Sequence, residues 1–225
     1  AFMEAATNGK KWQTHWVTDE NQPGPEYEAK DVLRAMAEGT WYCGDPGVQY
    51  DTTINQWHTC PNSGPINASN PCSEYMFLDD TACNLSSLNL MKYQNADATF
   101  VVDHASYPTP AIAENSHMYR PLGLGYANLG SLLMSMGIPY DSETGRGICG
   151  SLTALLNGQA YLTSSQIASK IGTFAGYNEN REPMLNVMQM HRDAVEKIDP
   201  NCPVYLRDAA REVWNDCLTS GRQYG

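Results

Sequence analysis

Apolar residues recur every three or four positions over three stretches in the last third of the chain, which is the period of an amphipathic helix. The pattern predicts helices over residues 148–170, 183–198 and 205–219. Gly221 follows the last of these stretches, where a glycine often caps a helix C-terminus. A shorter helix is predicted over residues 27–38, and Gly39 is expected to end it.

Short apolar runs between polar stretches predict strands in the middle of the chain. One such run covers residues 75–78. Leu85, Leu88 and Leu90 then alternate with polar residues, as in a strand or an irregular buried segment. Residues 121–140 carry no charge but contain several glycines, which indicates a buried strand or turn followed by a short core helix rather than a membrane span. The mixture of short strands and amphipathic helices predicts the α/β fold class.

Polar and turn-forming residues separate these elements. A turn is predicted over residues 22–25, and polar loops over 43–47, 48–70 and 94–116. The chain shows no internal repeat of about 20–50 residues, which argues against a solenoid.

Composition narrows the class of protein. The 225-residue chain is long enough for one ordinary domain or for part of a larger one. Hydrophobic residues make up 42% and charged residues 17%, which excludes a disordered acidic tail. The net charge of −11 argues against a nucleic-acid binder or a membrane-surface binder, because both of those surfaces are anionic. The 7 cysteines include no CxxC pair, and no secretory signal opens the chain, so we expect a cytoplasmic protein.

One glycine-rich motif has a simple explanation. Gly123, Gly125 and Gly130 depart from the spacing of the dinucleotide-binding fingerprint. We expect these glycines to allow close backbone packing at a turn into a helix.

A metal-binding module is an alternative hypothesis for this chain. Its candidate ligands are Cys43, His58, Cys60 and Cys72. Only His58 and Cys60 are close in sequence, and the other spacings are not those of a compact zinc site, so we expect no metal ligands.

The densest chemistry lies in residues 68–74, where Asn70, Cys72 and Glu74 occupy alternate positions. In an extended segment this spacing places all three side chains on one face, and Pro71 stiffens the backbone. A nearby carboxylate disfavours a thiolate, and no histidine is close in sequence to activate one. The trio therefore suits a neutral thiol that loses a hydrogen atom beside a base and an amide. The alternative is a buried cysteine that packs as a small apolar residue, with Glu74 at the surface.

This segment resembles the finger loop of class II ribonucleotide reductases, the adenosylcobalamin-dependent class. The central resemblance is carried by Ser69-Asn70-Pro71-Cys72-Ser73-Glu74-Tyr75-Met76-Phe77-Leu78-Asp79-Asp80-Thr81-Ala82-Cys83-Asn84-Leu85. Further similar stretches are residues 43–51, 57–64, 120–130, 176–177 and 180–182. The resemblance implies that residues 1–225 are a central fragment of the catalytic domain, a partial ten-stranded α/β barrel with its finger loop at about residues 68–85.

The resemblance also implies a role for individual residues. Cys72 matches the thiyl-radical cysteine, Glu74 the base on the ribose 3′-hydroxyl, and Asn70 the amide that hydrogen-bonds the ribose. Cys83 matches one member of the redox-active dithiol, whose partner in the family lies upstream of residue 1. The implied substrate-contacting residues are Ser69, Asn70, Pro71, Cys72, Ser73 and Glu74, and none is implied to bind a metal.

The implied activity is reduction of ribonucleotides to 2′-deoxyribonucleotides for DNA precursor synthesis, with adenosylcobalamin as the cofactor. The implied partners are a ribonucleoside di- or triphosphate and a thioredoxin-like reductant, and a homodimer is left open. A closed barrel has no free strand edges, so we expect this stretch alone to be inactive.

Two further alternatives remain open at this point. The Asn-x-Cys-x-Glu core is shared with class I large subunits, which import their radical from a second protein. The second is a non-catalytic remnant that binds only a nucleotide or another subunit, which the short polar segment at residues 94–119 leaves open. The class I enzyme differs in needing a radical-relay tyrosine pair near its C-terminus.

Overall fold

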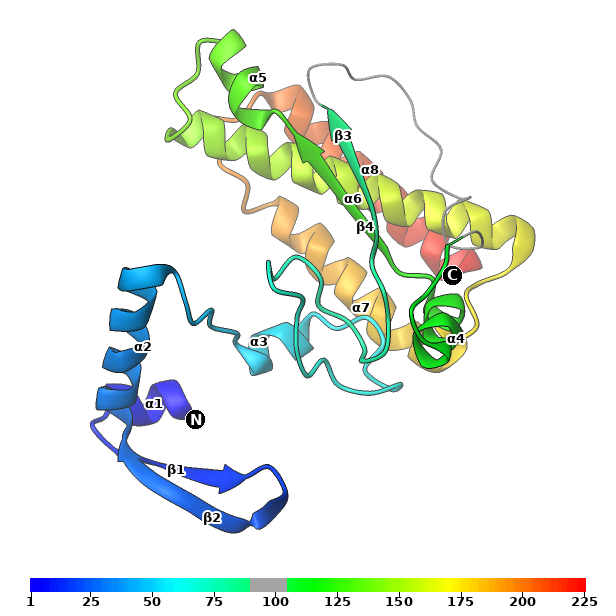
Figure 1. Cartoon of the computed structure of the whole chain (residues 1–225). Helices are drawn as coiled ribbons and strands as arrows, with labels where there is room; N and C mark the ends of the chain where they lie inside the picture. Colours follow the sequence, from blue (N-terminus) through cyan, green and yellow to red (C-terminus); the bar gives the residue numbers. More distant parts are fainter. Residues whose placement is uncertain (90–104) are drawn as a thin grey trace. The chain divides into compact units, whose positions relative to one another are not determined.

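The computed structural model describes residues 1–89 and 105–225, which form two compact units (Figure 1). The first unit is Ala1–Tyr50 and the second is Asp51–Gly225. Leu90 and the beginning of the predicted loop 94–116 lie outside the described residues.

The first unit combines two helices with a two-stranded antiparallel hairpin. Its elements are α1 (Phe2–Thr7), β1 (Lys11–Trp16), β2 (Asp19–Glu28) and α2 (Ala29–Cys43). Ala5, Ala6 and Ala29 are buried at its centre. The rings of Phe2 and Trp12 pack beside these alanines, edge to face, with centroids 5.3 Å apart. Small side chains thus let the two helices approach each other closely.

The turn predicted over residues 22–25 is wrong, because these residues lie inside β2. Pro23 pairs with His15 at a place where the register of the hairpin shifts. A proline is tolerated in a strand at an edge or at such an irregularity, since no ladder hydrogen bond is needed from its nitrogen.

The predicted end of the second helix at Gly39 is also wrong. α2 continues to Cys43, and Gly44 then adopts a left-handed conformation with φ of 80°. The Gly44 N–H donates to the Thr40 carbonyl over 2.9 Å, which caps the helix. Gly39 instead leaves room for the backbone carbonyl of Asp45, which folds back against the helix.

The second unit is mostly helical and holds one parallel strand pair among its described residues (Figure 1). Its elements are α3 (Asp51–Gln56), β3 (Asn84–Asn89), α4 (Pro110–Tyr119), β4 (Leu122–Ala127), α5 (Leu129–Ser135), α6 (Glu143–Ile171), α7 (Tyr177–Val195) and α8 (Val204–Tyr224). The predicted loop over 48–70 is interrupted only by the short α3.

Helices α6, α7 and α8 pack together around the main hydrophobic core, and all three were predicted from their periodicity. The buried core residues are Val187, Met188, Val195, Ala210, Val213, Trp214, Cys217 and Leu218. Trp214 is 1% exposed and stacks on the His191 ring at a centroid distance of 5.2 Å. A Cβ on Gly158 of α6 would lie 2.8 Å from Val213, so glycine at this position allows α8 to pack closely against α6.

The ends of these helices differ from the prediction for local reasons. α6 begins at Glu143 because the Ser142 Oγ accepts a hydrogen bond from the Gly145 N–H over 3.0 Å. Gly221 does not cap α8, since the helix continues to Tyr224 and Gly221 packs near Leu185.

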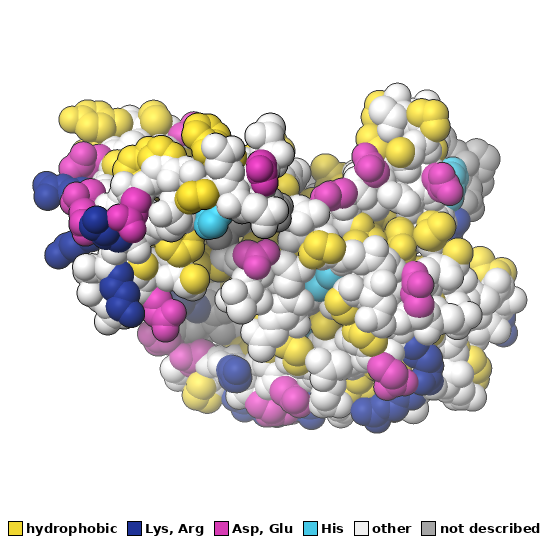
Figure 2. Space-filling view, turned by 90° about the horizontal axis from the view of Figure 1, so that it is seen from below, with side chains coloured by type: hydrophobic (Ala, Val, Ile, Leu, Met, Phe, Trp, Pro, Cys, Tyr) yellow, Lys and Arg dark blue, Asp and Glu magenta, His cyan; other side chains and the backbone are white. Residues whose placement is uncertain are grey.

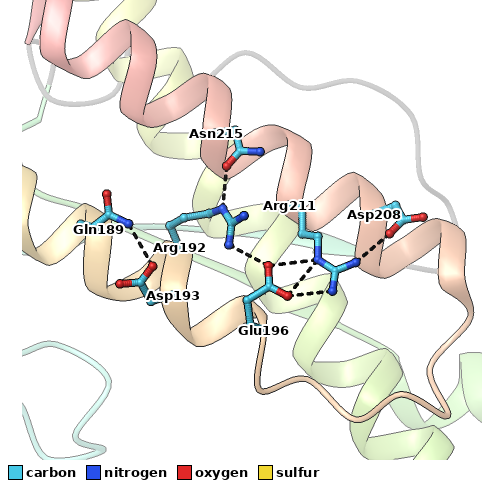
Figure 3. A network of polar contacts seen from close by, with 7 residues as sticks. All are labelled: Gln189, Arg192, Asp193, Glu196, Asp208, Arg211 and Asn215. Carbon is cyan, nitrogen blue, oxygen red and sulfur yellow. Dashed lines mark hydrogen bonds and ion pairs between the residues drawn. The ribbon is translucent and has the colours of Figure 1, made fainter.

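A polar network on the surface joins α7 to α8 (Figure 3). Glu196 accepts from Arg192 over 2.8 Å and from Arg211 over 2.7 Å. Arg211 also reaches Asp208 over 2.9 Å, and Arg192 donates to Asn215 over 2.6 Å. The hydrogen bond from Arg211, followed by that from Arg192, lowers the pKa of the Glu196 carboxyl. The groups lie near solvent, so the network orients the two helices more than it stabilises them.

β3 and β4 pair in parallel, as Figure 1 shows, with Leu85 opposite Gly123 and Ser87 opposite Gly125. The predicted strand or turn in residues 121–140 is therefore confirmed as β4, and the short helix after it as α5. The expected backbone packing at a turn is wrong for Gly123, which lies within a strand and packs closely against the side chains of Cys83 and Leu85. The predicted strand at 75–78 is wrong, because these residues join no ladder.

α4 is a helix in a region for which only a polar loop was predicted. Its start is marked by Thr109, whose Oγ1 accepts from the Ile112 N–H over 3.2 Å, and by Pro110 in the first turn. This Thr-Pro pair is a recognisable start signal in the sequence. α4 follows β3 and precedes β4 along the chain, as a parallel pair requires of its connection.

The described residues contain two sheets of two strands each and no closed barrel. Within the same residues, no helix is both long enough and apolar enough to cross a membrane. Acidic, basic and apolar side chains are interspersed on the face shown in Figure 2. Large exposed apolar side chains include Val17, Trp41, Tyr42, Leu85, Met134 and Ile171.

We expect Trp214→Ala to loosen the α6–α8 core, since removing a buried tryptophan costs about 3–5 kcal/mol. Hydrogen exchange measured by mass spectrometry should show reduced protection in peptides from α6, α7 and α8. Tyr205→Ala is the matched control, because Tyr205 lies in the same helix but is 68% exposed. Equal loss of protection in both variants would contradict this assignment of the core.

Candidate active site

Residues 70–75 form a closed turn that Asn70 holds through three of its atoms. The Asn70 N–H donates to the Tyr75 carbonyl over 3.3 Å, and the Asn70 carbonyl accepts from the Ser73 N–H over 3.0 Å. The Asn70 Oδ1 atom accepts from the Tyr75 N–H over 3.0 Å. Ser73 completes the turn in a left-handed conformation with φ of 64°. The turn is thus closed by both the backbone and a side chain of one residue.

The extended geometry predicted for residues 70–74 is therefore wrong. The Asn70 side chain offers the Tyr75 N–H a local partner, and this hydrogen bond folds the chain back. Cys72 and Glu74 are exposed on the turn, while Asn70 is half-buried. An exposed Cys72 does not fit the alternative of a buried packing cysteine, although Glu74 is at the surface as that alternative predicted.

The chain after the turn is anchored by an aromatic cluster that the sequence did not predict. The Phe77 ring meets His58 and Tyr119 edge to face, each with a centroid distance of 5.8 Å. It also lies 6.3 Å from the Tyr75 ring, and Leu78 beyond it is buried. These contacts join the turn to α4, which carries Tyr119. Cys72 and Glu74 are thus exposed on the turn, whereas the chain that follows it is fixed by packing.

Cys83 lies half-buried after this segment, and its electrostatic environment includes Glu74. Burial raises the pKa of the Cys83 thiol, and the charge of the Glu74 carboxylate raises it further. Burial likewise raises the pKa of Tyr75 to about 12, against the hydrogen bond that its hydroxyl donates to the Thr81 Oγ1 over 2.8 Å. The fold therefore lets the charge of Glu74 act on the Cys83 thiol. Cys72 and Cys83 are both free thiols, and no disulfide joins them.

Two of the similar stretches, 57–64 and 180–182, meet through hydrogen bonds. The fully buried Asn180 accepts from the Asn62 N–H over 2.9 Å and donates to the Ser63 Oγ over 2.7 Å. Pro183 has no N–H to offer the Glu179 carbonyl one turn earlier, and the Asn62 side chain donates to that carbonyl instead. This explains how α7 continues through a proline that the sequence analysis placed at the helix start.

His58 and Cys60 are used for packing. The His58 Nε2 atom donates to the Gly64 carbonyl over 2.9 Å, and its Nδ1 atom accepts from the Cys60 N–H over 3.4 Å. Both ring nitrogens are therefore engaged. Burial raises the pKa of the Cys60 thiol to about 11. Among residues 1–89 and 105–225, no three His, Cys, Asp or Glu side chains gather as metal ligands.

The family model described as "Ribonucleotide reductase, barrel domain" matches residues 3–225 of the chain. The chain belongs to this family. The match covers nearly the whole sequence, so the turn at residues 70–75 and the strands β3 and β4 all lie within a ribonucleotide reductase barrel domain. The predicted family and barrel type are confirmed, although the described strands do not close a barrel.

Similar curated proteins carry names of one kind. The chain is 58% identical over 244 residues to a vitamin B12-dependent ribonucleotide reductase of Rhodopirellula baltica, covering 100% of the chain and 23% of that protein. It is 45% identical over 251 residues to a protein of the same name from Streptomyces coelicolor, covering 100% of the chain and 26% of that protein. A vitamin B12-dependent ribonucleoside-diphosphate reductase of Mycobacterium tuberculosis is 31% identical over 171 residues, with 68% of the chain and 25% of that protein covered. The chain thus spans about a quarter of the length of these relatives.

In the full-length protein, we expect Glu74→Gln to lower the pKa of the Cys83 thiol, because removing a negative charge favours the thiolate. The rate of Cys83 alkylation by iodoacetamide, followed by peptide mass spectrometry, should reach its half-maximum at a lower pH than in the wild type.

Asp80→Asn is the matched control for this experiment. Asp80 is an exposed carboxylate in the same segment, and its charge does not contribute to the shift at Cys83. This control should leave the alkylation profile unchanged. If Glu74→Gln also left it unchanged, the carboxylate would not act on the thiol.

Proposed function

We propose that the full-length protein containing this chain reduces ribonucleotides to 2′-deoxyribonucleotides, and that this chain supplies the radical cysteine, the base and one redox thiol. The observation that carries the proposal is the turn at residues 70–75. Cys72 and Glu74 are exposed to solvent on this turn, and the charge of the Glu74 carboxylate raises the pKa of the Cys83 thiol. The family match and the names of the relatives support this assignment.

Each residue has a distinct chemical role in the proposed reaction. Cys72 gives up its thiol hydrogen atom, and the resulting thiyl removes the hydrogen from C3′ of the ribose. Glu74 accepts the proton of the 3′-hydroxyl while water leaves from C2′. Asn70 orients the ribose through its amide Nδ2, since its Oδ1 atom is engaged in closing the turn.

Cys83 and a second thiol supply the two electrons. The C2′ hydroxyl and two thiols become a C2′ hydrogen, one disulfide and one water, so atoms and electrons balance. The second thiol is assigned to the part of the full-length protein that precedes this chain, as the family resemblance implies. A thioredoxin-like dithiol would then reduce the disulfide by exchange.

Adenosylcobalamin is the proposed cofactor, because the similar proteins are named vitamin B12-dependent. When bound, it would supply the radical chemistry that activates a thiol. Cys72 fits the thiol that this chemistry would activate, since the residue is exposed on a turn closed by hydrogen bonds. The surface that holds the corrin ring is assigned to other parts of the full-length protein.

The substrate is a ribonucleoside di- or triphosphate, which contacts residues 69–74. Ser69 and Asn70 are half-buried in this stretch, and Pro71, Cys72, Ser73 and Glu74 are exposed. This pattern leaves one open face of the turn for a ribose. We place the reductase in the cytoplasm, where a thiol reductant is available, and a homodimer is compatible with this site.

The names of the relatives favour class II over a class I large subunit, which shares the same Asn-x-Cys-x-Glu core. A non-catalytic remnant is the second alternative. The exposed thiol and the closed turn argue against it, because a remnant has no need to keep a reactive group presented in this way.

In the full-length enzyme, we expect Cys72→Ser to abolish both C3′ hydrogen exchange and product. An alcohol O–H bond is much stronger than a thiol S–H bond, so serine cannot readily form the radical that starts the reaction. The measurement is release of tritium from ribonucleotide labelled at C3′, in the presence of adenosylcobalamin. Tritium release by this variant would remove Cys72 from its assigned role.

Cys83→Ser should fail at a later step. Cys72 and Glu74 remain in place, so hydrogen abstraction at C3′ begins, but the dithiol that completes the reduction is lost. The same assay should therefore show tritium release and free base without deoxynucleotide. Normal turnover with a thioredoxin-like reductant would show that Cys83 is not a redox thiol.

A further inference from the structure

We propose that Gly123 and Ser116 are positioning residues that fix the sulfur of Cys83, an inference that rests on the proposed function. Gly123 lies on β4 and Ser116 on α4, and each contacts the chain just before β3, at Cys83 and at Ala82 respectively. Neither residue touches the reacting ribose in our account. Both act through Cys83.

Gly123 provides the space that the thiol occupies. The parallel register places Gly123 opposite Leu85, two residues after Cys83. A Cβ built on Gly123 would overlap the Cys83 Sγ and the Leu85 Cδ2 atoms. The backbone conformation of Gly123 is one that any residue can adopt, so contact with the sulfur, rather than a positive φ, requires glycine here.

Gly125 gives the internal comparison on the same strand. It pairs with Ser87, and a Cβ built on it would lie 3.5 Å from the Ser87 Oγ, which is ordinary van der Waals contact. An alanine should therefore fit at 125 and not at 123. The two positions differ mainly in the neighbouring side-chain atoms that an added Cβ would meet.

Ser116 fixes the backbone immediately before the thiol. Its side chain is fully buried, and its Oγ accepts a hydrogen bond from the Ala82 N–H over 3.2 Å. The neighbouring Asn115 donates to the Asp79 carbonyl over 3.3 Å, so α4 holds the same segment at a second point. Without the hydroxyl, the half-buried Ala82 N–H would lose this partner.

Sulfur position matters because a disulfide forms only within narrow limits of distance and dihedral angle. Cys83 must meet its partner thiol during each turnover, in a step separate from the hydrogen abstraction by Cys72. Displacing the Cys83 sulfur should therefore impair reduction while leaving abstraction intact. A general loss of structure would impair both steps in parallel.

The test uses the full-length enzyme and compares Gly123→Ala with Gly125→Ala. Single-turnover assays with C3′-tritiated ribonucleotide would measure tritium release, free base and deoxynucleotide. We expect Gly123→Ala to lower deoxynucleotide formation about 100-fold, as misplacement by about 1 Å can do, while tritium and base are still released. Gly125→Ala should match the wild type. A Gly123→Ala enzyme whose product and tritium release stay normal, or fall by the same factor, would overturn the proposal.

Ser116→Ala is a milder variant that keeps the proposal testable if Gly123→Ala does not fold. Its control is Ser151→Ala, which removes another fully buried serine, one that contacts Cys202 instead. Without cofactor, the alkylation rate of Cys83 should change in Ser116→Ala and stay at the wild-type value in Ser151→Ala. Equal rates in all three proteins would remove Ser116 from this role. Absence of tritium release from the wild type would instead refute the proposed function, so the two failures are distinguishable.

Discussion

The parallel register of β3 with β4 is the constraint on which the site depends. It pairs Leu85 with Gly123 and thereby places Cys83 over a point where β4 has no side chain. A slip by one residue would bring Leu122 or Leu124 to that point, and the side chains of the strand would exchange faces. Strand pairing outside the turn thus decides where the Cys83 thiol lies.

Before β3 in the chain, the turn at residues 70–75 is exposed, and the residues that follow it are fixed by packing. The turn carries Cys72 and Glu74, which are exposed, and Asn70 closes it through hydrogen bonds to Tyr75 and Ser73. Residues 75–78, which follow the turn, are held by aromatic contacts and by α4. Reactive groups that must meet a substrate gain from this combination, because access is retained while the positions are set before binding.

The sequence predicted the elements whose signal is local and periodic. α6, α7 and α8 followed from apolar residues at helical spacing, and β4 with α5 from an uncharged glycine-rich stretch. The fold of the turn could not be predicted in this way, because alternation at residues 70, 72 and 74 suggested extension, whereas hydrogen bonds of the Asn70 backbone and side chain reverse the chain. The effect of the Glu74 charge on Cys83 depends on how the chain folds between them, and the contact of Gly123 with Cys83 joins parts of the chain 40 residues apart, so no local pattern encodes either.

The most direct test of the proposed roles follows the thiols of Cys72 and Cys83 through one turnover of the wild-type full-length enzyme. Ribonucleotide and adenosylcobalamin would be added without a reductant, free thiols alkylated, and the peptides identified by mass spectrometry. The account predicts that Cys83 enters one disulfide for each deoxynucleotide formed, while Cys72 is recovered as a free thiol. Formation of deoxynucleotide with Cys83 still alkylated as a free thiol would contradict it.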